Sequence, residues 1–258
     1  MKKIGVIIIT KNEEKNIKEC LDSVLWADEI ILVDDESSDK TVEIASKYSN
    51  VKIFTKKMDK GFAEQKNYAL SKISSEWVLN IDADERVTEE LKNEIIEKIN
   101  KENFDGYLLR RKNFVFGDWW LDDRPSALRL FKRSKGKFNN VFVHEKVILD
   151  GSVGVLQNPL LHYSKALREI SNYIEIYLND YTTKAAIDFE NKGIKISKFN
   201  ILYYFLIKPI LVFLQRYIFR RYFLKGIRGL FLAQFVTMAY LISYMKLWEK
   251  NIKKNHAE

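Results

Sequence analysis

Residues 77–86 read Trp-Val-Leu-Asn-Ile-Asp-Ala-Asp-Glu-Arg, an apolar run that ends in three acidic residues within four positions. The run predicts a buried strand, and such a strand does not normally end in a cluster of like charges. Alternate side chains of an extended segment point the same way, so Asp82 and Asp84 can direct both carboxylates at one point. A divalent cation that carries a diphosphate would relieve their repulsion, because hard ions prefer oxygen ligands. A structural interpretation stays open: the acids can cap the helix expected from Thr88, where the helix dipole favours carboxylates.

Strand-like and helix-like segments alternate through the first hundred residues. One helix is entered through Ser37, Ser38 and Asp39, which are good N-cap residues. The alternation predicts an α/β fold with a mostly parallel sheet and helices on both faces, and ligands of such sheets bind at the carboxyl ends of the strands. The expected strands are Ile4–Ile9, Glu29–Val33, Val51–Phe54 and Trp77–Ile81, and the expected helices are Glu14–Leu25, Lys40–Tyr48, Ala63–Ile73 and Thr88–Ile99.

Polar residues gather at these strand ends. Thr10-Lys11-Asn12-Glu13 follows the first expected strand, Asp34-Asp35 follows the second, and the acids at 82–85 follow the fourth. A carboxylate at the second strand end can accept hydrogen bonds from a ribose or a base N–H, although such a stretch taken alone is more often a turn and helix cap. Together the three clusters indicate one ligand site.

The sequence changes character twice after the first hundred residues. Residues 106–164 are short strands and turns, as expected of a mixed or antiparallel extension, and helical sequence resumes at Leu167, so we expect domains at 1–165 and 166–258. The net charge is +8, but residues 197–258 alone carry 11 Lys and Arg against 2 Asp and Glu, a balance of +9. The single Cys20 is expected to be an inert packing residue, and the N-terminal apolar run is too short for a signal peptide.

The basic, aromatic tail permits three interpretations. Its Lys and Arg recur at spacings of three or four residues, which favours helices that lie in the interface of an anionic membrane. Its longest uncharged run, Gly229–Met245, has 17 residues and reaches about 26 Å as a helix, slightly short of a membrane span. An ordinary helical or homo-oligomer-forming subdomain is the third interpretation.

The ordered motifs resemble those of the family 2 glycosyltransferases, which have the GT-A fold. The resemblance covers residues 3–165 and rests on Ile7–Glu14, Val33–Thr41 and Asp82–Glu85. Within the family the chain resembles a bacterial subgroup that adds glucose to the inner core of lipopolysaccharide. The supporting motifs are Val143-His144-Glu145, Leu161-His162-Tyr163-Ser164 and Lys246-Leu247-Trp248-Glu249. The family's usual Asp-Asp-Gly-Ser is Asp-Asp-Glu-Ser here, which puts only the local turn geometry in doubt.

This resemblance implies roles for particular residues. Asp82 and Asp84 match the Asp-x-Asp pair that binds the ribose and the divalent ion, Mg²⁺ or Mn²⁺, and His162 matches a histidine that completes the metal or phosphate site in many enzymes of this fold. Without that match, a histidine after an apolar run is more often a core residue. The residues that match the nucleotide-sugar site are Thr10, Asn12, Glu13, Asp34, Asp35, Gln65, Lys66, Asn67 and Asp82.

An inverting transfer needs a base that takes the proton of the acceptor hydroxyl. The resemblance places a catalytic carboxylate near Glu145, and Asp122 or Asp123 is the rival base. The neighbouring loop carries Trp119 and Trp120, which are suited to stacking on sugar faces. Four arginines could meet phosphates, although basic residues on strands are more often simply solvated; these are Arg110, Arg111, Arg129 and Arg133.

Together with the basic tail, the resemblance implies an enzyme at the cytoplasmic face of the bacterial inner membrane, peripheral or monotopic, that moves a hexose from a UDP-linked donor to a lipid-linked saccharide. A polyprenyl-phosphate glycosyltransferase differs only in its acceptor. A nucleotidyltransferase would carry a glycine-rich loop after the first strand, and the stretch Thr10–Glu14 has no glycine. A membrane or nucleic-acid adaptor would leave three acidic clusters without a role, so we expect no nucleic-acid partner.

Overall fold

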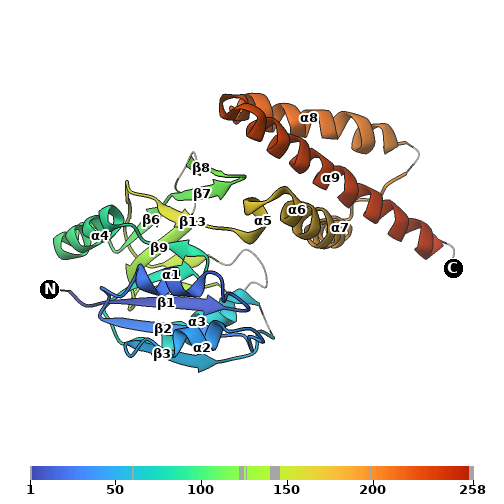
Figure 1. The fold of residues 1–258 in the computed structure, drawn as a ribbon. Coiled ribbons are helices and arrows are strands. Elements are labelled where there is room, and N and C mark those ends of the chain that lie inside the picture. The colour runs from blue at the N-terminus through green and yellow to red at the C-terminus, as the bar shows by residue number, and fades with distance from the viewer. Residues whose placement is uncertain are drawn as a thin grey trace. The chain divides into compact units, whose positions relative to one another are not determined.

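The computed structural model describes residues 2–255 except 60, 122–124, 126, 140–145 and 198. The chain forms two compact units. Unit 1 consists of Met1–Phe114 and Trp119–Ser164, and unit 2 consists of Val115–Asp118 and Lys165–Glu258. Figure 1 shows the sheets in the first unit and the long helices in the second.

Unit 1 is built on a seven-stranded mixed sheet with the order β12-β6-β9-β4-β1-β2-β3. Strands β4, β1, β2 and β3 are parallel, whereas β9 runs antiparallel to both β4 and β6. Two smaller sheets, β5-β13-β7-β8 and β10-β11, complete the unit. The bounds are β1 Ile4–Thr10, β2 Glu29–Asp34, β3 Val51–Thr55, β4 Trp77–Asp82, β5 Glu85–Arg86, β6 Gly106–Leu109, β7 Arg111–Val115, β8 Asp118–Leu121, β9 Ala127–Lys132, β10 Gly136–Phe138, β11 Val147–Leu149, β12 Val153–Val155 and β13 Leu160–His162.

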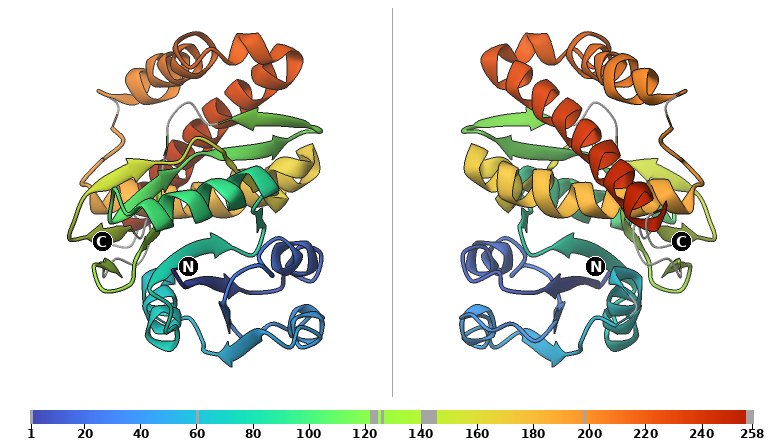
Figure 2. Two further views of the ribbon diagram at one scale, coloured as in Figure 1. Left: turned by 90° about the vertical axis from the view of Figure 1, so that its left-hand side faces the viewer. Right: turned by 90° about the vertical axis from the view of Figure 1, so that its right-hand side faces the viewer.

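Apolar side chains alternate across the sheet, so both of its faces are covered. Val6 and Ile8 of β1 pack in one core cluster with residues of α1 and α4, whereas Ile7 packs in a second cluster with residues of α3. Figure 2 shows α1 and α2 on one side of the sheet and α3 on the other. This arrangement confirms the α/β fold with helices on both faces. The helices are α1 Ile17–Asp22, α2 Thr41–Ala45, α3 Phe62–Lys72 and α4 Glu89–Lys101.

Two predicted helices are shorter than expected. The first begins at Ile17 rather than Glu14, because the amides of Asn16 and Ile17 both donate to the carbonyl of Glu13 and hold the preceding residues in a turn. The second ends at Ala45 rather than Tyr48. The predicted strands lie within one residue of the observed ones, since each strand extends by a single polar residue at its carboxyl end.

Unit 2 is mainly helical, and its non-helical parts include the Val115–Asp118 segment and residues 192–197. Lys246 of α9 donates to the carbonyl of Asn179 (2.8 Å), and the rings of Phe189 and Tyr244 stack at 4.8 Å, so α9 packs on α7. Among the described residues one helix, Tyr222–Lys253, is long and apolar enough to cross a membrane by length and composition. The elements are α5 Lys165–Arg168, α6 Ile170–Tyr173, η1 Ile174–Tyr181, α7 Thr182–Asn191, η2 Tyr203–Ile207, α8 Lys208–Leu214, η3 Gln215–Phe219, η4 Tyr222–Lys225 and α9 Gly226–Asn255.

Candidate active site

The carboxyl ends of three parallel strands meet at one edge of the large sheet. Thr10 is the register partner of Asp34, and Ile9 is the partner of Asp82. The amide of Asp35 donates to the carbonyl of Thr10 (2.9 Å), which fixes the first two strand ends to each other. The sheet therefore brings the predicted polar clusters together, at the place where open α/β sheets bind ligands.

Asp82 is held by two cations. Its Oδ1 accepts from Nζ of Lys66 (3.1 Å), and its Oδ2 accepts from a guanidinium nitrogen of Arg129 (2.9 Å). Burial alone would raise the pKa of Asp82, but Arg129 and Lys66 hold this pKa well below its usual range. A third of the side chain is still exposed, at 32%. Asp82 is thus an ionised carboxylate that faces protein cations.

Asp84 lies instead beside His162. Nε2 of His162 is 3.4 Å from Oδ2 of Asp84, and Nδ1 of the same ring is 2.7 Å from Oδ1 of Asn113. Because the amide oxygen of Asn113 can only accept, Nδ1 carries a proton and Nε2 faces the carboxylate. Burial lowers the pKa of His162, but the Asp84 carboxylate outweighs this effect and the net shift is upward.

The Asp84–His162 pair has the chemistry of a metal site. An imidazole nitrogen and a carboxylate are both ligands of divalent ions, and a metal-binding histidine usually donates its other N–H to an oxygen, as His162 does to Asn113. Within the described part of the chain, however, no three His, Cys, Asp or Glu side chains surround one point. Two of the three predicted ligands, Asp84 and His162, are therefore together, and the third, Asp82, is turned to Lys66 and Arg129.

Glu85 and Arg129 form a buried support for these acids. Glu85 is fully buried, and its Oε2 accepts the backbone N–H of Asp82 (2.8 Å). Its Oε1 accepts from Arg129 (3.1 Å) and lies 3.9 Å from Arg111. Burial raises the pKa of Glu85, although Arg129 opposes the shift. Arg129 thus joins Asp82 to Glu85 and fixes the backbone at the strand end.

The general expectation that strand arginines are solvated is wrong for Arg129, which is only 7% exposed. It lies on β9, the antiparallel neighbour of β4, so the sheet places it against the acidic strand end. The available signal was a charged residue between Leu128 and Leu130, within the apolar part of the strand. Sequence alone did not show that β9 inserts next to β4.

Replacing Arg129 with Met is expected to lower the free energy of unfolding by about 3–5 kcal/mol, because the change leaves the buried Glu85 and the partly exposed Asp82 without their shared cation. Urea unfolding of the purified protein measures the loss. Arg133→Met is the matched control, since Arg133 is exposed just beyond the same strand, and it should change stability by less than about 0.5 kcal/mol. Equal stability of the two variants would contradict a supporting role for Arg129.

The residues predicted to line the nucleoside pocket lie in interlocked turns after β1 and β2. Asn12 has a left-handed backbone (φ 55°). Its side-chain Oδ1 accepts from the backbone N–H of Ser38 (2.8 Å), and its backbone N–H donates to the hydroxyl oxygen of Ser37 (2.8 Å). Asp34 accepts from the amide (2.9 Å) and hydroxyl (2.5 Å) of Ser37. The turns that carry these residues are therefore tied to each other.

Three further predicted pocket residues lie at the same edge. Asp35 is buried and accepts from Lys11 (2.9 Å) and from the amide of Met58 (2.7 Å). Burial raises the pKa of Asp35, but the two hydrogen bonds outweigh this effect and the net shift is downward. The amide of Glu13 donates to Thr41 (2.7 Å), which joins its loop to the start of α2. The hydroxyl oxygen of Thr10 is buried and has no hydrogen-bond partner among the described residues.

The three predicted residues of α3 have different surroundings. Lys66 reaches Asp82 and is 3% exposed. Gln65 donates to the carbonyl of Lys56 (2.7 Å), and Asn67 exchanges two hydrogen bonds with the backbone of Phe138, each 3.0 Å long. The Gln65 and Asn67 side chains thus hold backbone segments around the site, and Lys66 is the one of the three that contacts an acid of the site.

Two faces of the small sheet β5-β13-β7-β8 differ in chemistry. His162 pairs with Asn113 and with Glu85 in register, so these side chains share the face toward the acids. The ring of Trp119 packs edge-on against those of Phe114 and Tyr163, with centroid distances of 5.2 Å and 5.0 Å. By the alternation of strand side chains, Phe114 points away from Asn113 and so away from the acids. The expected sugar-stacking role of the tryptophan loop remains a prediction.

The residues predicted for the catalytic base lie outside the part of the chain that the structure describes. They are Glu145, its neighbour His144, and the rival bases Asp122 and Asp123.

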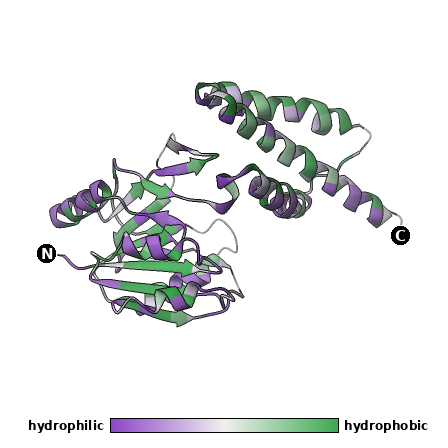
Figure 3. Cartoon of the chain, in the orientation of Figure 1, coloured by the Kyte–Doolittle hydropathy of each residue, from purple (hydrophilic) through white to green (hydrophobic). Residues whose placement is uncertain are grey.

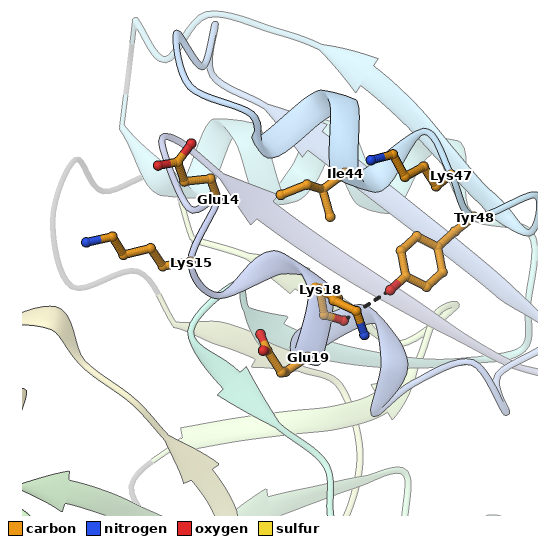
Figure 4. A pocket seen from close by; sticks show the side chains of 7 residues that line it. All are labelled: Glu14, Lys15, Lys18, Glu19, Ile44, Lys47 and Tyr48. Carbon is orange, nitrogen blue, oxygen red and sulfur yellow. Dashed lines mark hydrogen bonds between the residues drawn. The ribbon is translucent and has the colours of Figure 1, made fainter.

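One hollow of unit 1 lies elsewhere, between α1 and α2. Its volume is about 420 Å³, and its lining includes Lys18, Lys47 and Tyr48. Figure 4 shows these side chains around an open depression. Since none of its lining residues is one of the acids at the strand ends, we assign the site by the polar geometry and not by this hollow.

The chain belongs to glycosyl transferase family 2, whose family model matches residues 5–159. It is 32% identical to an uncharacterized glycosyltransferase of Rickettsia typhi over 99% of this chain and 90% of that protein. It is 26% identical to the lipopolysaccharide core biosynthesis glycosyltransferase LpsC of Rhizobium meliloti over 97% of this chain and 94% of LpsC. The crystal structure of S. aureus TarS 1-349 in complex with UDP-GlcNAc aligns with a TM-score of 0.52 at 18% identity, over 95% of this chain and 92% of that one. The predicted family, its GT-A fold, the enzyme class and the resemblance to lipopolysaccharide core enzymes are confirmed.

Proposed function

We propose that this glycosyltransferase uses a divalent ion, Mg²⁺ or Mn²⁺, to transfer glucose with inversion from UDP-glucose to a lipid-linked saccharide such as the lipopolysaccharide inner core. The observation that carries the proposal is the 3.4 Å approach of His162 Nε2 to Asp84 at the carboxyl edge of the sheet, with Asn113 fixing the ring. A carboxylate and an oriented imidazole at that edge suit a metal–diphosphate.

Asp84 and His162 would hold the ion, which when bound neutralises the charge of the departing diphosphate. Asn113 fixes the ring by accepting a hydrogen bond from Nδ1–H of His162, which leaves Nε2 on the side of Asp84. Lys66 and Arg129 hold Asp82 ionised. Its partly exposed carboxylate can therefore accept a hydrogen bond from a ribose hydroxyl. Thr10, Asn12, Glu13, Asp34 and Asp35 form the nucleoside side of the site, and the buried Thr10 hydroxyl is suited to a donor-nucleotide contact.

The base in this proposal is Glu145, on the evidence of the family motif. Its carboxylate takes the proton of the acceptor hydroxyl while that oxygen forms the new bond to the anomeric carbon and the bond to the diphosphate oxygen breaks. Asp122 and Asp123 are the alternatives. The assignment is tested by substitution, as set out in the Discussion.

The lipid-linked acceptor is supported by the similarity to LpsC and by the basic, apolar unit 2. We place the enzyme at the cytoplasmic face of the inner membrane, where donor nucleotides are available and anionic lipids attract Lys and Arg. The boundary between the catalytic and the membrane-associated domain is proposed near residue 165. A homo-oligomer is the alternative use of the apolar surface of unit 2.

The direct test of this function is release of UDP from a panel of UDP-sugars in the presence of extracted lipid acceptor, with transfer measured by incorporation of labelled sugar. UDP-glucose with lipopolysaccharide core acceptor should give the fastest turnover. Turnover with polyprenyl phosphate and not with the lipid-linked saccharide would contradict the proposed acceptor. Absence of release with every nucleotide sugar would overturn the function.

UDP together with Mn²⁺ is expected to raise the melting temperature of the full chain by about 5–10 °C at a hundredfold excess over Kd. Binding to the native state at that excess contributes about 2.7 kcal/mol, and 1 kcal/mol corresponds to about 2–4 °C for a domain of this size. Differential scanning fluorimetry measures the shift. An equal shift in EDTA would contradict metal-dependent binding, and an equal shift with CDP would contradict the choice of uridine.

A further inference from the structure

The turn between α8 and α9 gathers large apolar and cationic side chains at the surface of unit 2. This hairpin turn, residues 218–227, connects two helices that pack against each other (Figure 1). Phe219 is 80% exposed and Leu224 is 66% exposed, which is unusual for side chains of this size in a soluble protein. The exposed apolar residues are Ile218, Phe219, Phe223, Leu224 and Ile227, and the exposed cations are Arg220, Arg221 and Lys225.

The hairpin turn has a defined shape. Arg221 has a left-handed backbone (φ 56°), and Gly226 adopts a positive φ of 59° where the chain enters α9. A Cβ atom on Gly229 would overlap the carbonyl oxygen of Tyr222, so this glycine allows η4 to lie directly on α9. Tyr217 contacts Phe223 edge-on at 6.3 Å across the turn. The apolar and cationic side chains are therefore presented on a fixed backbone.

Charge is divided sharply within unit 2. Residues 192–248 contain ten Lys and Arg and no Asp or Glu, whereas residues 174–191 contain four acids and a single Lys. The C-terminal half of α9 is tied to the acidic segment, since Lys246 donates to the carbonyl of Asn179 (2.8 Å) and Lys250 pairs with Glu190. The hairpin turn lies at the opposite end of α9. Figure 3 shows that α8 and the adjoining part of α9 are mainly hydrophobic, whereas the C-terminal end of α9 is hydrophilic.

We propose that the hairpin turn docks unit 2 on an anionic lipid bilayer. Its apolar side chains enter the boundary between headgroups and acyl chains, and its three cations contact lipid phosphates at the same depth. The inference rests on the proposed function, because an enzyme that glycosylates a lipid-linked acceptor must reach the bilayer surface. A second copy of the chain is a poorer occupant, because a symmetric contact through the turn would bring the same cations face to face.

Single-cysteine labelling of the full chain tests the proposal. The native Cys20 is fully buried, so an environment-sensitive fluorophore should react only with an introduced thiol. Leu224→Cys carries the probe in the hairpin turn. Ile187→Cys is the control, because Ile187 is 46% exposed in the same unit but lies on the acidic helix α7. Vesicles with 30% phosphatidylglycerol in phosphatidylcholine should shift the emission of the Leu224 probe to the blue, and brominated lipid should quench it, with neither effect at Ile187.

A variant without the three cations measures how much their charge contributes to membrane binding. Arg220→Gln/Arg221→Gln/Lys225→Gln should weaken binding to these vesicles roughly a hundredfold, since each cation near an anionic surface contributes about a factor of five. The matched variant Lys184→Gln/Lys192→Gln/Lys195→Gln removes the same charge elsewhere in unit 2 and should weaken binding less than tenfold.

Two results would overturn the proposal. One is equal emission of the Leu224 probe with and without anionic vesicles. The other is a blue shift that needs no lipid and grows with protein concentration, which would identify the turn as a contact between copies. Binding of UDP with Mn²⁺ is measured on the same samples. If UDP still binds but the probe does not respond to lipid, only the docking proposal fails. If the unsubstituted protein does not bind UDP, the proposed function fails.

Discussion

Replacing Asp84 with Asn is expected to reduce glycosyl transfer by about a thousandfold or more. The variant keeps the size of the side chain but removes the negative charge that would hold the divalent ion beside His162, and an ion at a leaving group contributes several kcal/mol to the transition state. Initial rates of labelled-sugar transfer, at saturating donor and Mn²⁺, measure the loss. Circular dichroism and the melting temperature should stay close to those of the unsubstituted protein, because Asp84 is not part of the buried Glu85–Arg129 support.

Asp150→Asn is the matched control, since Asp150 is an exposed acid of unit 1 in a turn beyond β11. It should retain full activity. His162→Gln should approach the loss of Asp84→Asn. Asn113→Ala should lose less activity than His162→Gln but more than Asp150→Asn, because the ring is kept but its orientation is not fixed. Full turnover by Asp84→Asn would remove the metal-binding role from this pair.

Replacing Glu145 with Gln is expected to lower transfer by about a hundredfold or more, with donor affinity nearly unchanged. The amide preserves shape and hydrogen bonding but cannot take the acceptor proton, and a positioned base contributes about 10²–10⁴-fold. Steady-state kinetics should show the loss in kcat, because the donor contacts are retained.

Asp122→Asn and Asp123→Asn are the comparison variants for this experiment. If one of them loses activity to the same extent while Glu145→Gln keeps most of it, that aspartate is the base. If Glu145→Gln instead raises KM for the donor strongly, Glu145 belongs to the donor site.

Local patterns in the sequence were sufficient to predict most of the fold of unit 1. The strands ending at Thr10, Asp34 and Asp82 were found because β-branched runs stop at polar residues, and the polar residues then identified the ligand edge. The first helix was predicted too long, because the pattern does not reveal that Glu13 closes a turn before Ile17. Helix ends depend on such hydrogen bonds more than on composition.

The roles of the acids could be predicted only in part. The sequence indicated that Asp82 and Asp84 act together, but their partners come from distant elements: Arg129 from β9, Lys66 from α3 and His162 from β13. No pattern of spacing encodes which strand neighbours β4, so the sequence did not predict that Arg129 is buried against Asp82 and Glu85. Nor did the sequence predict that Val115–Asp118, which include the end of β7 and the start of β8, belong to unit 2.

The central claim is that Asp84 and His162 bind a divalent ion that carries the donor diphosphate. Isothermal titration of UDP into the full chain, with Mn²⁺ and with EDTA, tests it most directly because it requires no acceptor and no knowledge of the sugar. We predict that Mn²⁺ tightens UDP binding by at least tenfold in the unsubstituted protein and in Asp150→Asn, and that this gain disappears in Asp84→Asn and in His162→Gln. The same Mn²⁺-dependent gain in Asp84→Asn would contradict the account.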